Sequence, residues 1–596
     1  MLGRKKWPKA PQAKPSQPIQ LDAKGFVHGG HALHAESTIF LQFIQRGFAG
    51  LWISCFDLLQ VQVPHGTKII LDFIWSLSKY FHVHFAPMNC TAKQAWTMMA
   101  SALLLLCASC MVGPDYKQPK PIPVEPFRSV EGAEANAEAA ELEGWWKNYN
   151  DPMLTSLIER AEKNNLTLQQ AVMNIAAFRS GFGISLSQLF PNVDLGGGYR
   201  RVLSNQVTNQ GSVTEAAPFN YWQYGATMPS WEIDIFGRIR RGMEASKARL
   251  EGSVEGWRLS LVTVRADVAN AYLAVRTFQA QLAIVKMNVD VLEQIYKVNK
   301  SKFKAQTISQ IDLSVSAAQL ATSRAMIPKL EASIQQQCNG LSLLVGEGPG
   351  PMQDELRTPA AIPLPAKFVD VGIPADLMRR RADVLSAEMD LEAATAEIGV
   401  ATANYYPSLS LVGDFSFAAS DFSSLGNWSN KVYSFGPTIA WNVFNAGLVT
   451  SQVNQKQAIA FRLALRWKET VLKAAGEVQT SIGNYAGAMR QMQAYETGLN
   501  DIQLGFDSVT ARYKAGTIQL NDLLDFEQEV LRVQIGLVQS RGLAAQNMVE
   551  LYRTLGGGWE TAEIPDAGRD AFDKNGPDML KTMPSLKEEA EGVSSS

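Results

Sequence analysis

Histidine is missing from most of this 596-residue chain. All six histidines lie near its start: His28, His31, His34, His65, His82 and His84. The remainder therefore has no imidazole for a Ser/His/Asp triad, a general base or a metal ligand. Glycine triplets occur at 196–198 and 556–558, but no Walker lysine follows them, so they predict no nucleotide-binding loop. We therefore expect no enzyme, no cofactor and no metal site.

The chain has no large net charge. It contains 55 basic and 57 acidic side chains, which give a formal net charge of -2. Nucleic acid attracts proteins mainly through their positive charge, so we expect no nucleic-acid partner. Cysteine is scarce as well. Beyond residue 109 only Cys110 and Cys338 remain, which excludes a disulfide framework.

Proline is absent from two stretches of about a hundred residues each, one after Pro229 and one after Pro437. Within them apolar residues recur at helical spacing, as in Leu261, Val264, Val268, Ala271, Tyr272 and Val275. A helix over 238–301 would be roughly 95 Å long at ~1.5 Å per residue. A compact globular domain does not reach that dimension, so the pattern predicts a coiled coil or an extended helical barrel.

Residues 88–110 read MNCTAKQAWTMMASALLLLCASC, which is the layout of a secretory signal peptide. The apolar run over 98–106 is too short to span a bilayer. The last four residues resemble a bacterial lipobox, in which the final cysteine, Cys110, is acylated and becomes the first mature residue. The alternative is an ordinary cleaved signal with an incidental thiol. Because a signal peptide works at the N-terminus, we interpret residues 1–87 as the result of a start codon placed too far upstream.

Between the helical stretches, apolar and polar residues alternate with period two. One face of 433–444 collects Tyr433, Phe435, Pro437, Ile439, Trp441 and Val443. Segment 409–418 alternates likewise, and 193–202 and 222–235 do so more weakly. Aromatic-rich strands of about ten residues are typical of a transmembrane β-barrel. Soluble sheets share this alternation, and it is the export signal together with the helical context that favours the membrane. Four strands cannot close a barrel, so we expect several copies to share one.

The chain also repeats itself. FKAQTISQIDL at 303–313 matches YKAGTIQLNDL at 513–523 in six of eleven positions, with an offset of 210 residues. At an offset of 216, Pro191 and Gly197 pair with Pro407 and Gly413. The body therefore reads as a duplication. Each half supplies a helix, two strands, a long helix, a turn and a return helix.

Several longer motifs stand in order along the chain: CMVGPDY (110–116), WWKNYNDPMLTSLIERAEKNNLTL (145–168), WEIDIFGRIRR (231–241), RRRADVLSAEMDLEAATAEIGVATANYYPSLSL (379–411) and LYRTLGGGWE (551–560). They resemble the TolC-like outer membrane efflux factors, and more closely the lipoprotein (NodT-type) branch of tripartite efflux pumps. The resemblance covers about 110–560, and its motifs are specific because they occur in the right order.

The resemblance implies a mainly α-helical fold with a transmembrane β-barrel portion. In a homotrimer, each chain would give four strands to a twelve-stranded barrel, and duplicated helical hairpins would form an α-barrel tunnel across the periplasm. The implied function is a passive exit duct for small molecules in the outer membrane of a Gram-negative bacterium, anchored in lipid through Cys110. Its implied partners are a periplasmic membrane-fusion adapter and an inner-membrane proton-driven (RND-type) transporter.

The resemblance also assigns roles to the two repeat turns, which would be periplasmic tips that contact the adapter. Their residues are Ala305, Gln306, Thr307 and Ile308 in the first tip, and Ala515, Gly516, Thr517 and Ile518 in the second. Gly516 matches the family's tip glycine, which suits the positive φ of a tight turn. Gln306 replaces that glycine in the first tip.

Beyond the second tip, Asp522 and Asp525 match an aspartate pair that lines the narrowest point of the tunnel. Their i, i+3 spacing puts both carboxylates on one helix face. Threefold symmetry would bring six together, which attracts cations. Tyr513 and Asp312 match positions that help to hold this constriction closed, whereas Ile518 replaces a basic residue that the family often has. Without the resemblance, a solvated coiled-coil face explains these aspartates.

We therefore divide the chain into six parts. They are a mis-assigned or unstructured extension (1–87), a lipoprotein signal peptide (88–109), a lipidated N-terminal segment (110–144), two efflux repeats (145–350 and 370–560) and a disordered tail (561–596). Two other functions stay open: an outer membrane channel for type I protein secretion, and a lipid-anchored periplasmic coiled-coil adapter without a pore.

Overall fold

In a computed structural model of the protein, the described residues are 111–120, 122, 142, 144–204, 217–364, 380–559 and 562. All of them belong to one structural unit of the chain. The predictions for the extension 1–87, for the signal peptide 88–109 and, apart from residue 562, for the tail 561–596 lie outside the described residues. Cys110 also lies outside them, directly before Met111.

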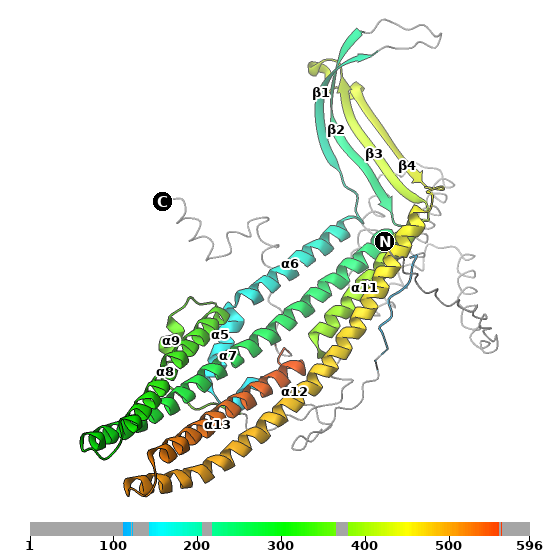
Figure 1. The fold of residues 1–596 in the computed structure, drawn as a ribbon. Coiled ribbons are helices and arrows are strands. Elements are labelled where there is room, and N and C mark those ends of the chain that lie inside the picture. Colours follow the sequence, from blue (N-terminus) through cyan, green and yellow to red (C-terminus); the bar gives the residue numbers. More distant parts are fainter. Residues whose placement is uncertain are drawn as a thin grey trace, which may run out of the picture. The chain divides into compact units, whose positions relative to one another are not determined.

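The described part of the chain is mainly helical, and its main elements occur twice in the same order (Figure 1). The first series is η1 (Trp145–Tyr149), α5 (Pro152–Asn164), α6 (Leu166–Ser187), β1 (Asp194–Ser204), β2 (Ala217–Ile233), α7 (Arg238–Lys304), α8 (Gln310–Val345) and α9 (Pro351–Glu355). The second is α11 (Ala382–Ala403), β3 (Ser408–Ala419), η2 (Phe422–Ser424), η3 (Trp428–Asn430), β4 (Lys431–Ala440), α12 (Leu448–Lys514) and α13 (Leu520–Thr554). The predicted duplication is confirmed.

The two longest helices, α7 and α12, contain 67 residues each and are therefore about 100 Å long at ~1.5 Å per residue. α7 packs against its return helix α8, and α12 packs against α13, so each repeat contains one long hairpin (Figure 1). α8 continues through Pro328, because packing against α7 stabilises the helix where the proline donates no hydrogen bond. None of the helices that the structure describes combines the length and the apolar character that a membrane span requires.

The four strands form one antiparallel sheet in the order β1-β2-β3-β4 (Figure 1). The register between β2 and β3 shifts between Met228 and Trp231. This irregularity accommodates Pro229, which has no N–H for the hydrogen-bonded ladder.

Two strand boundaries differ from the sequence prediction. β2 begins at Ala217, well before the predicted segment 222–235, because it pairs with β1 as far as Ser204. β4 ends at Ala440 rather than at residue 444. The chain leaves the sheet there because the Trp441 indole N–H donates to the carbonyl of Tyr405 at 3.1 Å.

The last turn of each return helix is tied to the helix that precedes the strands. In the first repeat, Asn165 before α6 donates from Nδ2 to the carbonyl of Leu344 in α8, at 2.8 Å. In the second repeat, Arg381 before α11 donates from Nη1 to the carbonyl of Thr554 in α13, also at 2.8 Å. The two contacts occupy equivalent places in the repeats. Arg381 follows Asn165 by 216 residues and Thr554 follows Leu344 by 210, which are the two offsets found in the sequence.

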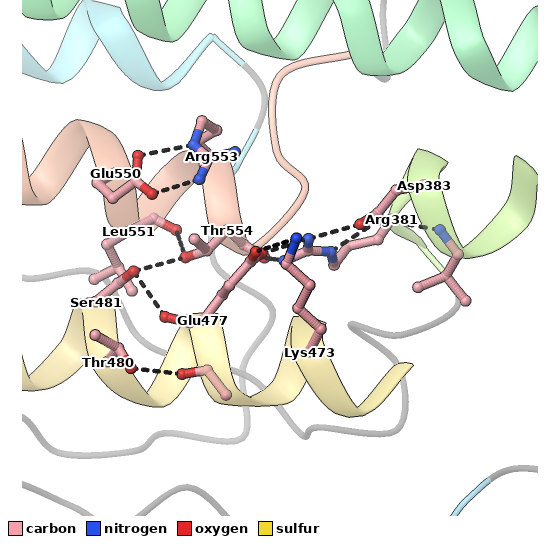
Figure 2. A network of polar contacts seen from close by, with 12 residues as sticks. Arg381, Asp383, Lys473, Glu477, Thr480, Ser481, Glu550, Leu551, Arg553 and Thr554 are labelled. Carbon is pink, nitrogen blue, oxygen red and sulfur yellow. Dashed lines mark hydrogen bonds and ion pairs between the residues drawn. The ribbon is translucent and has the colours of Figure 1, made fainter. Parts of the chain in front are cut away.

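The second repeat adds charge to this contact (Figure 2). Arg381 forms ion pairs with Asp383 at 2.8 Å and with Glu477 on α12 at 2.7 Å. Its side chain is almost fully buried, so the two carboxylates and the Thr554 carbonyl replace the water that the guanidinium loses. One arginine thus connects α11, α12 and the end of α13.

An aromatic core joins the N-terminal motif to the middle of the hairpins. Trp145 stacks on Tyr552 with ring centroids 5.2 Å apart. Asp151 caps α5 by accepting from two backbone N–H groups, and it also accepts from the hydroxyl of Tyr272 at 2.6 Å. The hydroxyl of Tyr149 donates to the carbonyl of Ala545 at 2.7 Å. The WWKNYNDP motif therefore joins the start of α5 to α7 and joins η1 to α13.

Candidate functional site

The first tip connects α7 to α8. Gln306 has a positive φ of 59°, which is uncommon for a residue with a side chain. The N–H of Thr307 donates to the carbonyl of Lys302 at 3.0 Å, and the Thr307 hydroxyl donates to the same oxygen at 2.8 Å. These bonds close the C-terminal end of α7. Ser309 and Asp312 then form a capping box that begins α8.

The second tip repeats this arrangement between α12 and α13. Gly516 has a φ of 71°, and Thr517 donates from its N–H and its hydroxyl to the carbonyl of Arg512, at 3.0 and 2.9 Å. Gln519 and Asp522 form the capping box of α13. The glycine is therefore not needed to form the turn. Gln306 adopts the same left-handed conformation, which costs about 1 kcal/mol for a residue with a Cβ.

Tyr513 connects the two hairpins within one chain. Its hydroxyl donates to Oδ1 of Asn299 on α7 at 2.7 Å, and the Lys302 ammonium lies 4.3 Å from its ring centroid. The ring belongs to an apolar cluster with these buried members: Val285, Val289, Leu292, Leu320, Leu520, Leu523 and Leu524. Ile518 packs against the same cluster. Ile518, which stands where the family often has a basic residue, therefore makes an apolar contact at this tip.

Asp312 bonds within its own turn rather than with Tyr513. Its carboxylate accepts from the hydroxyl and from the N–H of Ser309, at 2.7 and 3.0 Å. The hydroxyl and then the backbone N–H lower the pKa of Asp312, because both stabilise the ionised carboxyl. Asp522 accepts from the N–H of Gln519 at 3.0 Å. The structure thus gives both aspartates a capping role that spacing did not predict.

Asp522 and Asp525 are both exposed on α13, one helical turn apart. The leucines next to them, Leu523 and Leu524, are buried against the other hairpin. The carboxylates are therefore on the side of α13 that faces away from α7. In the part of the chain that is described, no group of three or more His, Cys, Asp or Glu side chains is arranged to hold a metal ion.

The sheet has one aromatic face and one polar face. Tyr224 pairs with Phe417, and Phe415 pairs with Tyr433, so the aromatic positions of β2, β3 and β4 share a side. On the opposite side Gln223 donates to the hydroxyl of Ser416 at 3.2 Å. The alternation predicted along 409–418 and, as far as Ala440, along 433–444 is thus one continuous face across the strands.

The first described residues lie against the junction between β2 and α7. Val112 donates from its N–H to the carbonyl of Phe236 at 3.1 Å, and Met111 contacts Gly237. Arg241 donates to the carbonyl of Val112 and forms an ion pair with Asp115 at 2.6 Å. The CMVGPDY motif is therefore held where the sheet ends.

Sequence reasoning missed the polar partners inside the hairpin contact. Asn299 and Asn288 occupy positions of α7 whose helical neighbours are apolar, and Glu527 does so on α13. A polar residue at a core position of an amphipathic helix is the signal that could have found them.

A model of the family described as "outer membrane efflux protein" matches residues 157–347 and 373–557. The chain belongs to this family. Nodulation protein T of Rhizobium leguminosarum bv. trifolii is 29% identical over 453 residues, which are 76% of this chain and 94% of that protein. The toluene efflux pump outer membrane protein TtgC of Pseudomonas putida is 28% identical and covers 78% of this chain and 96% of its own. The solved outer-membrane channel OprN is 27% identical with a TM-score of 0.70, and covers 76% of this chain and 100% of its own.

As an outer membrane efflux protein, the chain is an exit duct of the outer membrane with a long helical portion in the periplasm. Members of the family are channels rather than enzymes. The fold comprises an α-barrel tunnel portion, to which the hairpins contribute, and a β-barrel portion, to which the sheet contributes. These findings confirm the predicted fold class and function.

Proposed function

We propose that three copies of this efflux protein form one duct, with four strands from each copy in a twelve-stranded barrel. The observation that carries the proposal is the open sheet, because β1 and β4 are its edges among the described strands. Hydrocarbon does not tolerate unpaired backbone groups, so each β1 must pair with β4 of the next copy. Native mass spectrometry of the detergent-solubilised protein should give the mass of three copies. A monomer that inserts into bilayers would contradict the proposal.

The long helix α12 supports the same assembly. Five of its large apolar residues are more than half exposed in one chain, namely Leu448 (55%), Phe461 (67%), Leu465 (53%), Leu472 (51%) and Leu504 (76%). Such side chains gain about 25 cal/mol for each Å² removed from water. Neighbouring copies would cover them around the tunnel.

The two tips are the proposed contact with a periplasmic membrane-fusion adapter, and an inner-membrane proton-driven (RND-type) transporter is the proposed source of energy for export. Ala305, Gln306, Ala515 and Gly516 are exposed, whereas both tip threonines bond back to their own helix. The tips therefore present nearly the same backbone shape twice per chain. A cysteine at either alanine should crosslink in cells to one and the same protein. A cysteine at the exposed Gln491 on α12 is the matched control, and a product from it alone would contradict the assignment.

Asp522 and Asp525 are the proposed lining of the tunnel's narrowest point. Six carboxylates from three copies would hold cations and repel anions. We expect Asp522→Asn with Asp525→Asn to reduce cation selectivity in planar bilayers. Asp507→Asn, an exposed carboxylate on the other helix of the same hairpin, is the control and should leave selectivity unchanged. Equal effects from both variants would rule out a special role for the pair.

Cys110 is the proposed site of acylation. Its neighbour Met111 contacts Gly237, just beyond the end of β2, which is where a lipid anchor would enter the periplasmic leaflet. Mass analysis of the membrane-extracted protein should find a chain that starts at Cys110 and carries the added acyl mass. Cys110→Ser should abolish that mass. An unmodified thiol at this position would contradict the proposal.

A further inference from the structure

A second polar contact joins the hairpins, between α7 and α13. Asn288 on α7 donates from Nδ2 to Oε1 of Glu527 on α13. Both side chains are buried, and Glu527 is only 4% exposed. The proposed gate and tips do not use this pair, although Glu527 follows Asp525 by two positions.

The surroundings of the pair are apolar. Leu523 and Leu524 precede Glu527 on the same face of α13, and Val285 and Leu292 flank Asn288 on α7. All four leucine and valine side chains belong to one buried cluster. A carboxylate in this position loses its hydration, and burial raises the pKa of Glu527 to about 7.

Two acceptors of the pair have no donor. Oε2 of Glu527 and Oδ1 of Asn288 are both buried and make no hydrogen bond to any residue that the structure describes. An ionised carboxylate cannot supply the missing hydrogen, because it only accepts. A protonated carboxyl can, since its O–H donates to Oδ1 while the Asn288 amide donates to Oε1. One proton thus satisfies both atoms, each of which would otherwise cost the penalty of an unpaired buried group.

No opposite charge takes the place of that proton. Glu293 is half-buried and paired with Arg324, and Glu529 is half-buried and paired with Arg532. The other charged groups near this level are exposed, on α7, α8, α12 and α13: Lys286, Asp290, Glu331, Asp501, Asp507, Arg512 and Asp525. Burial is the cause of the raised pKa, and none of these groups contributes to it.

We propose that Glu527 and Asn288 form a proton-dependent contact that holds α13 against α7, and that ionisation of Glu527 loosens the two hairpins. Its effect on gating rests on the proposed duct, because Asp525 lies on the same turn of α13 as Glu527. The structural step itself, separation of α7 from α13, needs no pore.

The direction of the pH effect follows from linkage. In the packed arrangement Glu527 titrates near 7, and when exposed it returns toward the ordinary value of 4.5. The packed arrangement therefore binds a proton that the separated one loses. Between these two pKa values, each pH unit lowers the equilibrium constant for packing by up to about tenfold. Above both values the proton no longer contributes to packing.

Hydrogen exchange of the full-length protein in detergent tests this directly. Protection of amides 520–531 and 284–292, corrected for intrinsic exchange rates, should fall at least about tenfold between pH 5 and pH 8. Glu527→Gln should abolish the dependence, because its amide stays neutral and still donates to Oδ1. Glu529→Gln, two residues away, is the matched control and should keep the wild-type profile.

Protection that stays constant in the wild type would overturn the proposal, as would the wild-type profile in Glu527→Gln. If that variant does not fold, Glu527→Met replaces it, because a side chain of similar size without an ionisable group should also remove the pH dependence. Conductance measured on the same samples separates the two proposals. If the protein never conducts but its amide protection changes with pH as expected, only the proposed duct is contradicted. If it conducts and its protection is independent of pH, only the proposed contact between Glu527 and Asn288 is contradicted.

Discussion

The two long helices of the chain have the same length and the same place in their repeats, but different surroundings. α7 makes extensive contacts with α5, α6, α8, α11 and α13, whereas α12 makes them with α11 and α13. α12 leaves five large apolar residues more than half exposed, whereas α7 leaves one, Met287. Duplication thus kept the backbone of the hairpin and changed its surface. Under the proposed trimer, α12 is the helix that meets other copies.

The two tips differ in sequence but have the same backbone conformation, in contrast to the two long helices, whose surroundings differ. Gln306 and Gly516 share the left-handed conformation, and both are followed by a threonine that bonds back to the preceding helix. The hydrogen bonds of the turn, rather than glycine, therefore determine its shape. Glycine only removes the strain.

The largest predicted effect is a difference in stability between a substitution in α7 and one in α12. Tyr272 is fully buried, and its hydroxyl bonds to Asp151, so Tyr272→Ala should lower the free energy of unfolding by about 4 kcal/mol. Phe461→Ala should cost less than about 1 kcal/mol within one chain but should reduce the trimer fraction. Thermal unfolding followed by circular dichroism, with native mass spectrometry, measures both. Equal unfolding effects would remove the contrast between the helices.

The second prediction compares the two ties at the ends of the return helices. Arg381→Ala leaves Asp383, Glu477 and the Thr554 carbonyl without their common donor and should cost about 3 kcal/mol. Asn165→Ala removes a neutral donor and a helix cap and should cost about 1–2 kcal/mol. Denaturant midpoints of the two variants test the order. A costlier Asn165→Ala would mean that charge adds nothing to the second tie.

The third prediction exchanges the tip residues. Gly516→Ala forces a Cβ into the left-handed region and should destabilise the second tip by about 1 kcal/mol, whereas Gln306→Gly should relieve about the same strain in the first. Hydrogen exchange at residues 300–312 and 510–522 reports each tip separately. If both substitutions have the same sign, glycine does more than remove strain.

The smallest effect concerns the capping boxes. The pKa of Asp312 is lowered in the folded protein, so its contribution is present above the ordinary value of 3.8 and is lost as the pH falls through the folded value. Protection of the amides at the start of α8, corrected for intrinsic exchange rates, should therefore fall by a few-fold between pH 5 and pH 3. Asp312→Asn should lower it at pH 5 and remove that pH dependence. A start of α8 that exchanges identically in both proteins would exclude the capping role.

Most of the fold could be predicted from the sequence, because its signals are periodic. The proline-free stretches with helical spacing gave α7 and α12, and the match between 303–313 and 513–523 placed both tips. Strand ends were less accurate, since β2 extends to Ala217 through pairing with β1 that no local pattern encodes.

The contacts between hairpins could not be predicted, because they join residues far apart in the chain. Asn299 meets Tyr513 and Asn288 meets Glu527, and each pair combines positions that periodicity alone marks as core. The contrast between α7 and α12 was hidden for the same reason. Both helices carry similar apolar spacing, and only the packed structure reveals which positions have neighbours.

The central claim is that this chain forms a conducting duct with an acidic constriction. Single-channel conductance of the purified full-length protein in planar bilayers tests it most directly. We expect cation-selective openings from an oligomer of three copies, with reduced cation selectivity when Asp522 and Asp525 are both replaced by alanine. Trimers that insert but never conduct, even with both aspartates replaced, would contradict it.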